Sequence, residues 1–283
     1  MISTRKKILS FIITAAGLIV LFLFAVNTGS LKVSPVELLK GLFIEYNPNV
    51  ATIFDLRFPR IFIAMLGGAA TAVSGVLLQA VMKNPLADPG IIGVNSGASL
   101  AAVLITAFFP SLYFFTPLFA FIGGMVAFLL VYSLSYKGGL SPLRIILVGV
   151  AVNAMFTGLM SAFNSGTGSN YSGVASIVNA NITMKTWDDF RTLLIYSVIG
   201  LIASLFVTGQ CNLLALEDKT ARSLGVNVTR SRIVISIIAV LLAGIATAVI
   251  GPISFLGLIV PHIARLLGQG TSISQRGAVF GKP

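Results

Sequence analysis

Long apolar runs constrain the fold of this chain more than any other feature. A helix needs roughly 20 apolar residues to cross the hydrocarbon core of a bilayer, and eight stretches come near that length. They are residues 8–26, 61–82, 91–109, 112–134, 143–163, 192–208, 233–250 and 253–268, of which the last is the shortest. The polar intervals between them are too short for a water-soluble domain. The pattern therefore predicts an all-α, polytopic integral membrane bundle, with its function in the bundle and its loops.

Composition supports the same conclusion. Hydrophobic residues make up 56% of the chain and charged residues only 10%, whereas a soluble domain carries about 25% charged residues. The net charge of +11 is spread over short loops and forms no stripe of the kind that nucleic-acid binding uses. The main solvent of this chain is therefore expected to be lipid.

The basic residues also predict an orientation. If the amino terminus is cytoplasmic, 13 of the 19 Lys and Arg residues fall on the inner side and six on the outer side. This is the asymmetry expected when positive loops stay inside the cell. The segment Arg5-Lys-Lys7 precedes the first apolar run without a clean cleavage site after it, so we interpret that run as a retained anchor and not as a cleaved signal.

Ionisable groups are scarce where an ion-driven carrier would need them. None of the eight Asp and Glu residues lies inside a predicted span, whereas proton- or sodium-coupled carriers usually bury carboxylates or a histidine relay. His262 is the sole histidine, and a hydrogen bond to a neighbouring helix explains it more simply than proton transfer does. Because the chain also lacks a Gly-x-x-x-x-Gly-Lys-Ser/Thr phosphate loop, we expect no enzyme activity and energy supplied by another polypeptide.

No resident cofactor is expected. Cys211 is the only cysteine, which excludes an internal disulfide and a cysteine-based metal cage. We interpret it as a small apolar filler at a helix end.

Small residues recur at every fourth position in several spans, as is typical of helices that pack closely in lipid. The stripes are Ala64, Gly68 and Ala72; Gly67, Thr71 and Gly75; Gly93, Gly97 and Ala101; and Ala239, Ala243 and Thr247. Packing within one subunit is the simpler interpretation, and a smooth wall for a bulky solute is the alternative.

Residues 212–225 predict a short amphipathic helix in a cytoplasmic loop. One face is formed by Leu213, Leu216, Thr220 and Leu224. Asp218 and Arg222 can pair one helical turn apart. Such a helix, tied to a span at each end, suits a groove on a partner protein. An ordinary solvated loop remains the alternative.

Two arginines form a corner before the second span. Arg57 and Arg60 flank Pro59, and arginine forks favour carboxylates, so this corner could dock an acidic protein surface. Anchoring to lipid phosphates is the alternative.

Segment 164–173 consists of small, loop-forming residues. One interpretation is that it lines the outer opening of a pathway through the bundle. The other is that it is an ordinary connecting loop without such a role.

These blocks together resemble a known family. The matching residues are Leu56-Arg-Phe-Pro-Arg60, Ser74-Gly-Val-Leu-Leu-Gln79, Asn84-Pro-Leu-Ala-Asp-Pro-Gly-Ile-Ile-Gly-Val-Asn-Ser-Gly-Ala98, the segment 215–225, and Gly251-Pro-Ile-Ser-Phe-Leu-Gly-Leu-Ile-Val-Pro-His-Ile-Ala-Arg265. The chain resembles the FecCD-type permease subunits of binding-protein-dependent ABC importers for vitamin B12, ferric siderophores and haem. The resemblance extends to about residue 270.

The resemblance implies a dimer of permeases in the bacterial cytoplasmic membrane, either homo- or heterodimeric. Two cytoplasmic ATP-binding subunits and an extracytoplasmic substrate-binding protein would complete the importer. Arg57 and Arg60 would then dock the binding protein. The residues implied to couple to the ATPase are Leu213, Leu216, Glu217, Asp218, Ala221, Arg222, Ser223, Leu224 and Gly225, and those implied beside the translocation path are Gln79, Asn84, Pro85, Asn95, Ser96 and Gly97.

One segment departs from the family. Members with this pattern have ten helices, whereas residues 271–283 fit neither a helix nor the family. We therefore expect a permease domain over residues 1–270, an atypical tail that resembles a truncation, and little uptake by this polypeptide alone. An ion-driven carrier and a non-transporting assembly protein are the rival functions.

Overall fold

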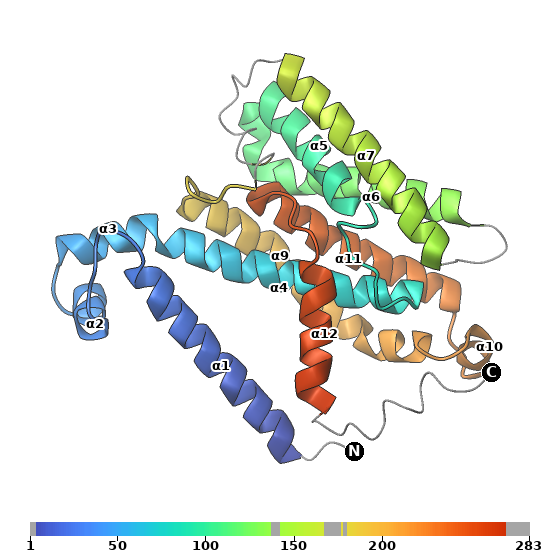
Figure 1. Cartoon of the computed structure of the whole chain (residues 1–283), viewed down its shortest axis with the longest axis horizontal. Helices are drawn as coiled ribbons and strands as arrows, with labels where there is room; N and C mark the ends of the chain where they lie inside the picture. The colour runs from blue at the N-terminus through green and yellow to red at the C-terminus, as the bar shows by residue number, and fades with distance from the viewer. Residues whose placement is uncertain (1–3, 137–141, 167–176, 178–179, 270–283) are drawn as a thin grey trace. The chain divides into compact units, whose positions relative to one another are not determined.

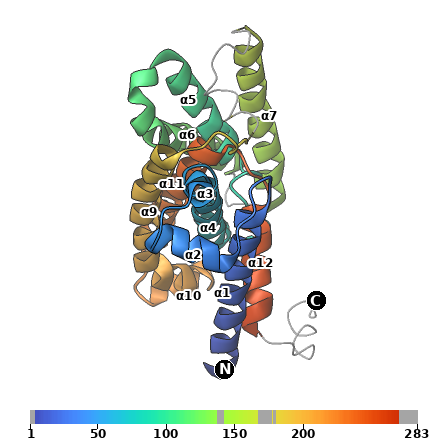
Figure 2. The same ribbon diagram turned by 90° about the vertical axis from the view of Figure 1, so that its left-hand side faces the viewer.

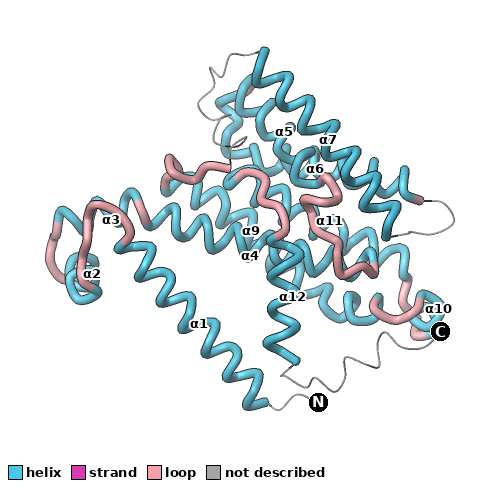
Figure 3. The backbone as a smooth tube through the Cα atoms, in the orientation of Figure 1, coloured by secondary structure: helices cyan, strands magenta, loops and turns pink. Residues whose placement is uncertain are grey.

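The computed structural model describes residues 4–136, 142–166, 177 and 180–269, and the elements in that part are helices (Figure 1, Figure 3). They are α1 (Thr4–Asn27), α2 (Pro35–Phe43), α3 (Pro48–Leu56), α4 (Phe58–Met82), α5 (Val94–Phe108), the 3-10 helix η1 (Pro110–Phe115), α6 (Thr116–Ser135), α7 (Pro142–Gly166), α9 (Trp187–Leu214), α10 (Asp218–Ser223), α11 (Val228–Ile250) and α12 (Leu256–Gln269). The predicted all-α bundle is confirmed. The predicted tail, residues 271–283, lies outside the described residues.

Six stretches in the described part are long and apolar enough to cross a membrane, and α5 and α12 provide two shorter apolar helices. These eight correspond to the eight predicted spans. One boundary differs in a way that matters, because α9 begins at Trp187 and not at residue 192. Its first turn therefore contains Asp188 and Asp189, so the expectation that no acidic residue lies in a span was wrong for this helix.

The chain divides into two compact units. One comprises the described residues up to 51 and from 259 onward, and the other is Thr52–Leu258. In the first unit α2 begins with a capping box, in which Ser34 Oγ accepts a hydrogen bond from Glu37 N at 3.2 Å and Glu37 accepts one from Ser34 N at 2.8 Å. Every site residue predicted from the sequence belongs to the second unit.

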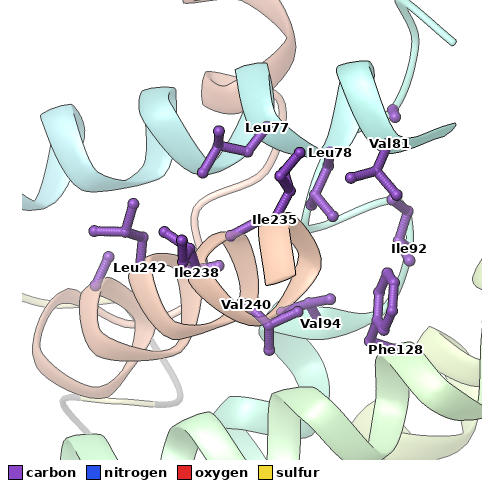
Figure 4. Packing of buried hydrophobic residues seen from close by; sticks show 14 of the residues in the cluster. Leu77, Leu78, Val81, Ile92, Val94, Phe128, Ile235, Ile238, Val240 and Leu242 are labelled. Atoms are coloured by element: carbon purple, nitrogen blue, oxygen red, sulfur yellow. The ribbon is translucent and has the colours of Figure 1, made fainter. Parts of the chain in front are cut away.

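Helix α11 is the core of the Thr52–Leu258 unit. It packs against α4, α5, α6 and α9. In its most apolar 18-residue stretch 78% of the residues are buried, against 28% in the corresponding stretch of α7. Figure 4 shows Leu77, Leu78 and Val81 of α4 on one side of α11, with Val94 and Phe128 of α5 and α6 on the other. Helices α4, α9 and α11 lie side by side in both Figure 1 and Figure 2.

Glycine allows α5 and α6 to approach closely. A Cβ at Gly97 would lie 2.6 Å from the carbonyl oxygen of Gly123, and a Cβ at Gly123 would lie 2.3 Å from the carbonyl oxygen of Gly97. Both distances are far below van der Waals contact, so the two backbones touch only because neither residue has a side chain. The Gly97 stripe is therefore a packing surface within the chain.

Two further small-residue stripes pack in the same way. Gly67, Thr71 and Gly75 are buried on α4, as are Ala239, Ala243 and Thr247 on α11. Ser74, between the two helices, donates a hydrogen bond to the Ala239 carbonyl oxygen at 2.6 Å. The stripe of Ala64, Gly68 and Ala72 differs, because none of its three residues is buried.

The α5–α6 contact predicts the effect of adding one methyl group. Gly97→Ala and Gly123→Ala should each lower the free energy of unfolding by about 1–3 kcal/mol, because a methyl group at either position overlaps the opposite backbone. Gly158→Ala on α7 is the matched control, since a Cβ at Gly158 would have no other atom within 4 Å. Thermal unfolding in detergent measures the difference, and equal midpoints for all three variants would contradict the packing described here.

Candidate functional site

The breaker loop, residues 83–93, leaves the helical path between α4 and α5, but most of its N–H groups have an acceptor within the chain. Lys83 ends α4 in the left-handed conformation, at φ 49°. Backbone or side-chain oxygens within the chain accept hydrogen bonds from the N–H groups of Asn84, Leu86, Ala87, Gly90, Ile91, Ile92 and Gly93. Pro85 and Pro89 have no N–H to satisfy. The loop is therefore an ordered element fixed by its own sequence.

Asp88 organises the second half of this loop. Its Oδ1 accepts hydrogen bonds from the N–H groups of Gly90 at 2.8 Å and Ile91 at 3.3 Å, and the residue is completely buried. Burial raises the pKa of Asp88 above its usual range, although the N–H groups of Gly90, Ile91, Phe255 and Gly257 partly oppose the shift. Asp88 thus accepts hydrogen bonds from N–H groups of the loop that have no partner in a helix.

The segment from Gly251 to Phe255, here called the Gly-Pro segment, is the second irregular element of this region. A Cβ at Gly251 would lie 2.6 Å from the Ile177 carbonyl oxygen, and its φ of 80° also favours glycine. Phe255 adopts a φ of 67°, which is strained for a bulky residue. The surrounding packing must therefore hold this backbone in place.

Two polar side chains attach the neighbouring helices to this backbone. Asn95 Nδ2 donates to the Ile253 carbonyl oxygen at 3.0 Å, and Gln79 Nε2 donates to the Gly257 carbonyl oxygen at 3.3 Å. Pro261 is four residues beyond Gly257 in α12 and has no N–H, so the Gly257 carbonyl lacks its regular helical donor. Gln79 supplies a donor in its place.

The structure buries most of the residues predicted beside the translocation path. Gln79, Asn84, Asn95 and Ser96 are 4–7% exposed and Gly97 is buried, whereas Pro85 is exposed. The side chains of Asn84, Asn95 and Ser96 bind backbone of the same chain. Their place beside a pathway stays a prediction, and in this chain they support the breaker loop and the Gly-Pro segment.

A charged cluster joins α10 to two other helices. Asp218 Oδ1 lies 2.7 Å from Lys83 Nζ and 3.0 Å from Arg232 Nη2, and Lys83 also donates to the Leu216 carbonyl oxygen. Asp218 begins α10, Lys83 ends α4 and Arg232 lies in the second turn of α11. We call these three residues the α10 junction.

The predicted helix over 212–225 needs correction. Helix α9 continues to Leu214, and α10 covers only Asp218–Ser223. Asp218 forms its ion pairs with Lys83 and Arg232 and not with Arg222 as predicted, because those two cations approach it from neighbouring helices. Local spacing could not reveal these long-range partners.

The predicted coupling residues divide by exposure. Ala221 is fully buried, and Leu213 and Asp218 are partly exposed. The remaining residues of the set face outward: Leu216, Glu217, Arg222, Ser223, Leu224 and Gly225. Leu216 and Leu224 are 40% and 60% exposed, which leaves apolar surface on both flanks of α10.

The arginine corner lies at the opposite end of α4 from α10. Arg57 is the residue before the first helical position, Arg60 lies in the first turn, and both are partly exposed. A cluster of aromatic rings adjoins this end, with centroids 4.8–6.0 Å apart, and consists of Phe54, Phe58, Phe62, Trp187 and Phe190.

Sequence reasoning missed a buried ion pair before the start of α9. Lys185 Nζ lies 3.2 Å from Asp189 Oδ1, and both residues are 7% exposed. The hydroxyl of Tyr113 donates to the same oxygen, and Thr186 N donates to Asp189 Oδ2 at 2.8 Å. The three-residue spacing of Thr186 and Asp189 is that of a capping box and could have revealed the start of α9, but nothing local indicates Tyr113.

Fold and site together define a polytopic helical membrane protein, with irregular buried backbone between its spans and a short charged helix at one end. The FecCD transport family model matches residues 17–276. The probable heme-iron transport system permease protein IsdF of Staphylococcus aureus strain MSSA476 is 39% identical over 270 residues, which cover 95% of this chain and 81% of that protein. The IsdF proteins of strains Newman and USA300 match to the same extent.

A solved structure agrees with this relationship. It is described as a metal-chelate type ABC transporter in an inward-facing conformation, and it matches with a TM-score of 0.72 at 25% identity, over 93% of this chain and 81% of that one. The chain belongs to the FecCD transport family. It is therefore a multi-pass membrane protein of a transport permease family, located in the cell membrane.

The α10 junction predicts a pH-dependent coupling between Lys83 and Asp218. The hydrogen bond from Lys83 holds the pKa of Asp218 below its usual range, partial burial opposes this shift, and the charge of Arg232 adds to it. A lowered pKa means that the pair stabilises the fold fully above the ordinary Asp pKa and loses that effect as the pH falls through the lowered value.

A double-mutant cycle of Lys83→Met and Asp218→Asn tests this. Both side chains are about one-third exposed, so we expect a coupling energy of only about 0.2–1 kcal/mol at pH 7. It should be unchanged at pH 5 and shrink below pH 4. A coupling that grows on acidification would contradict the assignment.

Proposed function

We propose that this chain forms half of the membrane pathway of an ATP-driven importer for an iron chelate, and that haem is the substrate. The observation that carries the proposal is the 39% identity, over 95% of the chain, to a probable heme-iron permease. The match to a metal-chelate type transporter supports the same substrate class. A ferric siderophore and cobalamin are the alternatives that the family leaves open.

The partners follow from the same proposal. A second permease subunit would complete the pathway, an extracytoplasmic protein would deliver the substrate, and two cytoplasmic ATP-binding subunits would supply energy. This arrangement requires the amino terminus and α10 to be cytoplasmic, as the distribution of positive charge predicts. Closure of the ATP-binding subunits would push α10 and switch the pathway between its two openings.

The exposed side of α10 supports its role as the contact with the ATP-binding subunit. Leu216 and Leu224 expose apolar surface beside the exposed charge of Arg222, and such a combination fits a groove on another protein. Because α10 follows α9 closely and precedes α11 closely, a force on it would reach two long helices directly.

The position of the arginine corner supports docking of the substrate-binding protein. Arg57 and Arg60 lie at the amino-terminal end of α4, where the helix dipole disfavours positive charge. Carboxylates on a partner would offset that cost and pair with the arginine forks. We further propose that Gln79, Asn84, Asn95 and Ser96 shape the pathway from behind, by fixing the breaker loop and the Gly-Pro segment.

Reconstitution tests the function. Vesicles that contain the permease with its ATP-binding subunit and binding protein should accumulate haem only when ATP is present, whereas a ferric siderophore and cobalamin added to parallel vesicles should stay outside. Uptake that persists without ATP and stops when the ion gradient is collapsed would instead indicate a secondary carrier. Binding of the ATP-binding subunit without movement of any of the three substrates would indicate an assembly protein.

The same vesicles test the coupling surface. Arg222→Asp combined with Leu224→Asp should abolish capture of the ATP-binding subunit and with it haem uptake, because the change places two negative charges on the exposed side of α10. Arg191→Asp, an exposed arginine in the first turns of α9, is the control and should retain capture.

A further inference from the structure

Helix α10 is attached to the bundle by more than the two chain connections to α9 and α11. Lys83, at the end of α4, reaches across to Asp218 and to the carbonyl oxygen of Leu216. Lys83 is 135 residues from Asp218 in sequence, so this contact is formed by folding and not by chain continuity. It is the direct polar link that the described structure shows between α10 and α4.

The charge balance of the α10 junction makes Asp218 its essential member. Lys83 and Arg232 contact the same oxygen, Asp218 Oδ1. If the carboxylate is neutralised, two cations remain side by side and repel each other. If Lys83 is removed instead, the pair of Asp218 and Arg232 remains. Loss of Asp218 should therefore disrupt the junction more than loss of either cation.

The junction leads directly into the breaker loop. Lys83 is the first residue of that loop, and Asn84, which follows it, is buried and accepts hydrogen bonds from Leu86 and Ala87. Farther along, a Cβ at Gly149 of α7 would lie 2.4 Å from the carbonyl oxygen of Ile91. The loop thus runs from the junction to the interface with α7, and a displacement of Lys83 would act on all of it.

We propose that Asp218 is a positioning residue that transmits movement of α10 through Lys83 to the breaker loop, and that it is not part of the surface that binds the ATP-binding subunit. The proposal rests on the proposed function, because it takes α10 as the site where that subunit acts. It assigns the two sides of α10 different tasks. Arg222 and Leu224 face outward for contact, and Asp218 faces the bundle for transmission.

A fluorescent label on the breaker loop tests the proposal without any transported substrate. Leu86 is 53% exposed, so Leu86→Cys in a Cys211→Ser background offers a single labelling site. The labelled permease is assembled with its ATP-binding subunit in nanodiscs, and the change in fluorescence on adding Mg-ATP is recorded. We expect Asp218→Asn to retain capture of the ATP-binding subunit but to lose most of the fluorescence change, because the ion pair that links α10 to Lys83 is gone.

Three control variants separate transmission from misfolding. Asp218→Glu retains the carboxylate and should keep the response. Lys83→Met keeps the pair of Asp218 and Arg232 but removes the link to the breaker loop, so it should reduce the response as much as Asp218→Asn does. Arg230→Met removes an exposed arginine from the first turn of α11, two residues before Arg232, and should respond like the unmodified protein.

Each remaining outcome counts against the proposal. An unchanged response in Asp218→Asn would show that movement reaches the loop by another route. Loss of capture in Asp218→Asn, with capture retained in Arg230→Met, would place Asp218 in the binding surface. If the parent protein captures the ATP-binding subunit but its label does not respond, transmission to the loop is wrong and the proposed function stands. If it does not capture that subunit, both fail.

Discussion

The irregular backbone between α4 and α5, and again between α11 and α12, sets the main physical requirement on this fold. A peptide N–H or C=O that leaves a helix and is buried within the protein must find a partner in the chain, because neither water nor lipid satisfies it there. The breaker loop meets this requirement with the carboxylate of Asp88, the amide of Asn84 and its own carbonyls. Gln79 and Asn95 serve the Gly-Pro segment and the start of α12 in the same way. Each of these polar side chains binds a backbone group that has no partner in a regular helix.

Close packing of small residues is the second feature that holds this fold together. Without a hydrophobic force between helices in lipid, contact depends on how near two backbones can come. Gly75 shows how strict the limit is, since a Cβ there would lie 2.0 Å from the Gly257 carbonyl oxygen, the atom that Gln79 binds. The glycine and the glutamine on α4 therefore serve one contact, in which one allows the approach and the other satisfies the carbonyl.

Much of this fold could be predicted from the sequence, because apolar runs of membrane-spanning length are a local signal. The eight spans, the end of α4 at the Lys83-Asn-Pro motif and the short helix before Gly225 all follow from nearby residues. The partners of Asp218 could not be found in this way, since Lys83 and Arg232 become its neighbours only when α4 and α11 pack together. The hydrogen bonds from Gln79 and Asn95 to the carbonyl oxygens of Gly257 and Ile253 could not be predicted either, because those carbonyls are also distant in the sequence. Sequence pattern locates such residues but not the atoms that they bind.

The central claim is that the chain itself satisfies the breaker loop, and hydrogen–deuterium exchange of the permease in nanodiscs tests it most directly. The amides of residues 86, 87 and 90–94 should exchange as slowly as those of the helices beside them. Gln79→Met should speed exchange around residue 257, whereas Gln210→Met, at an exposed position of α9, should not. Exchange of the loop amides within seconds in the parent protein would contradict the claim.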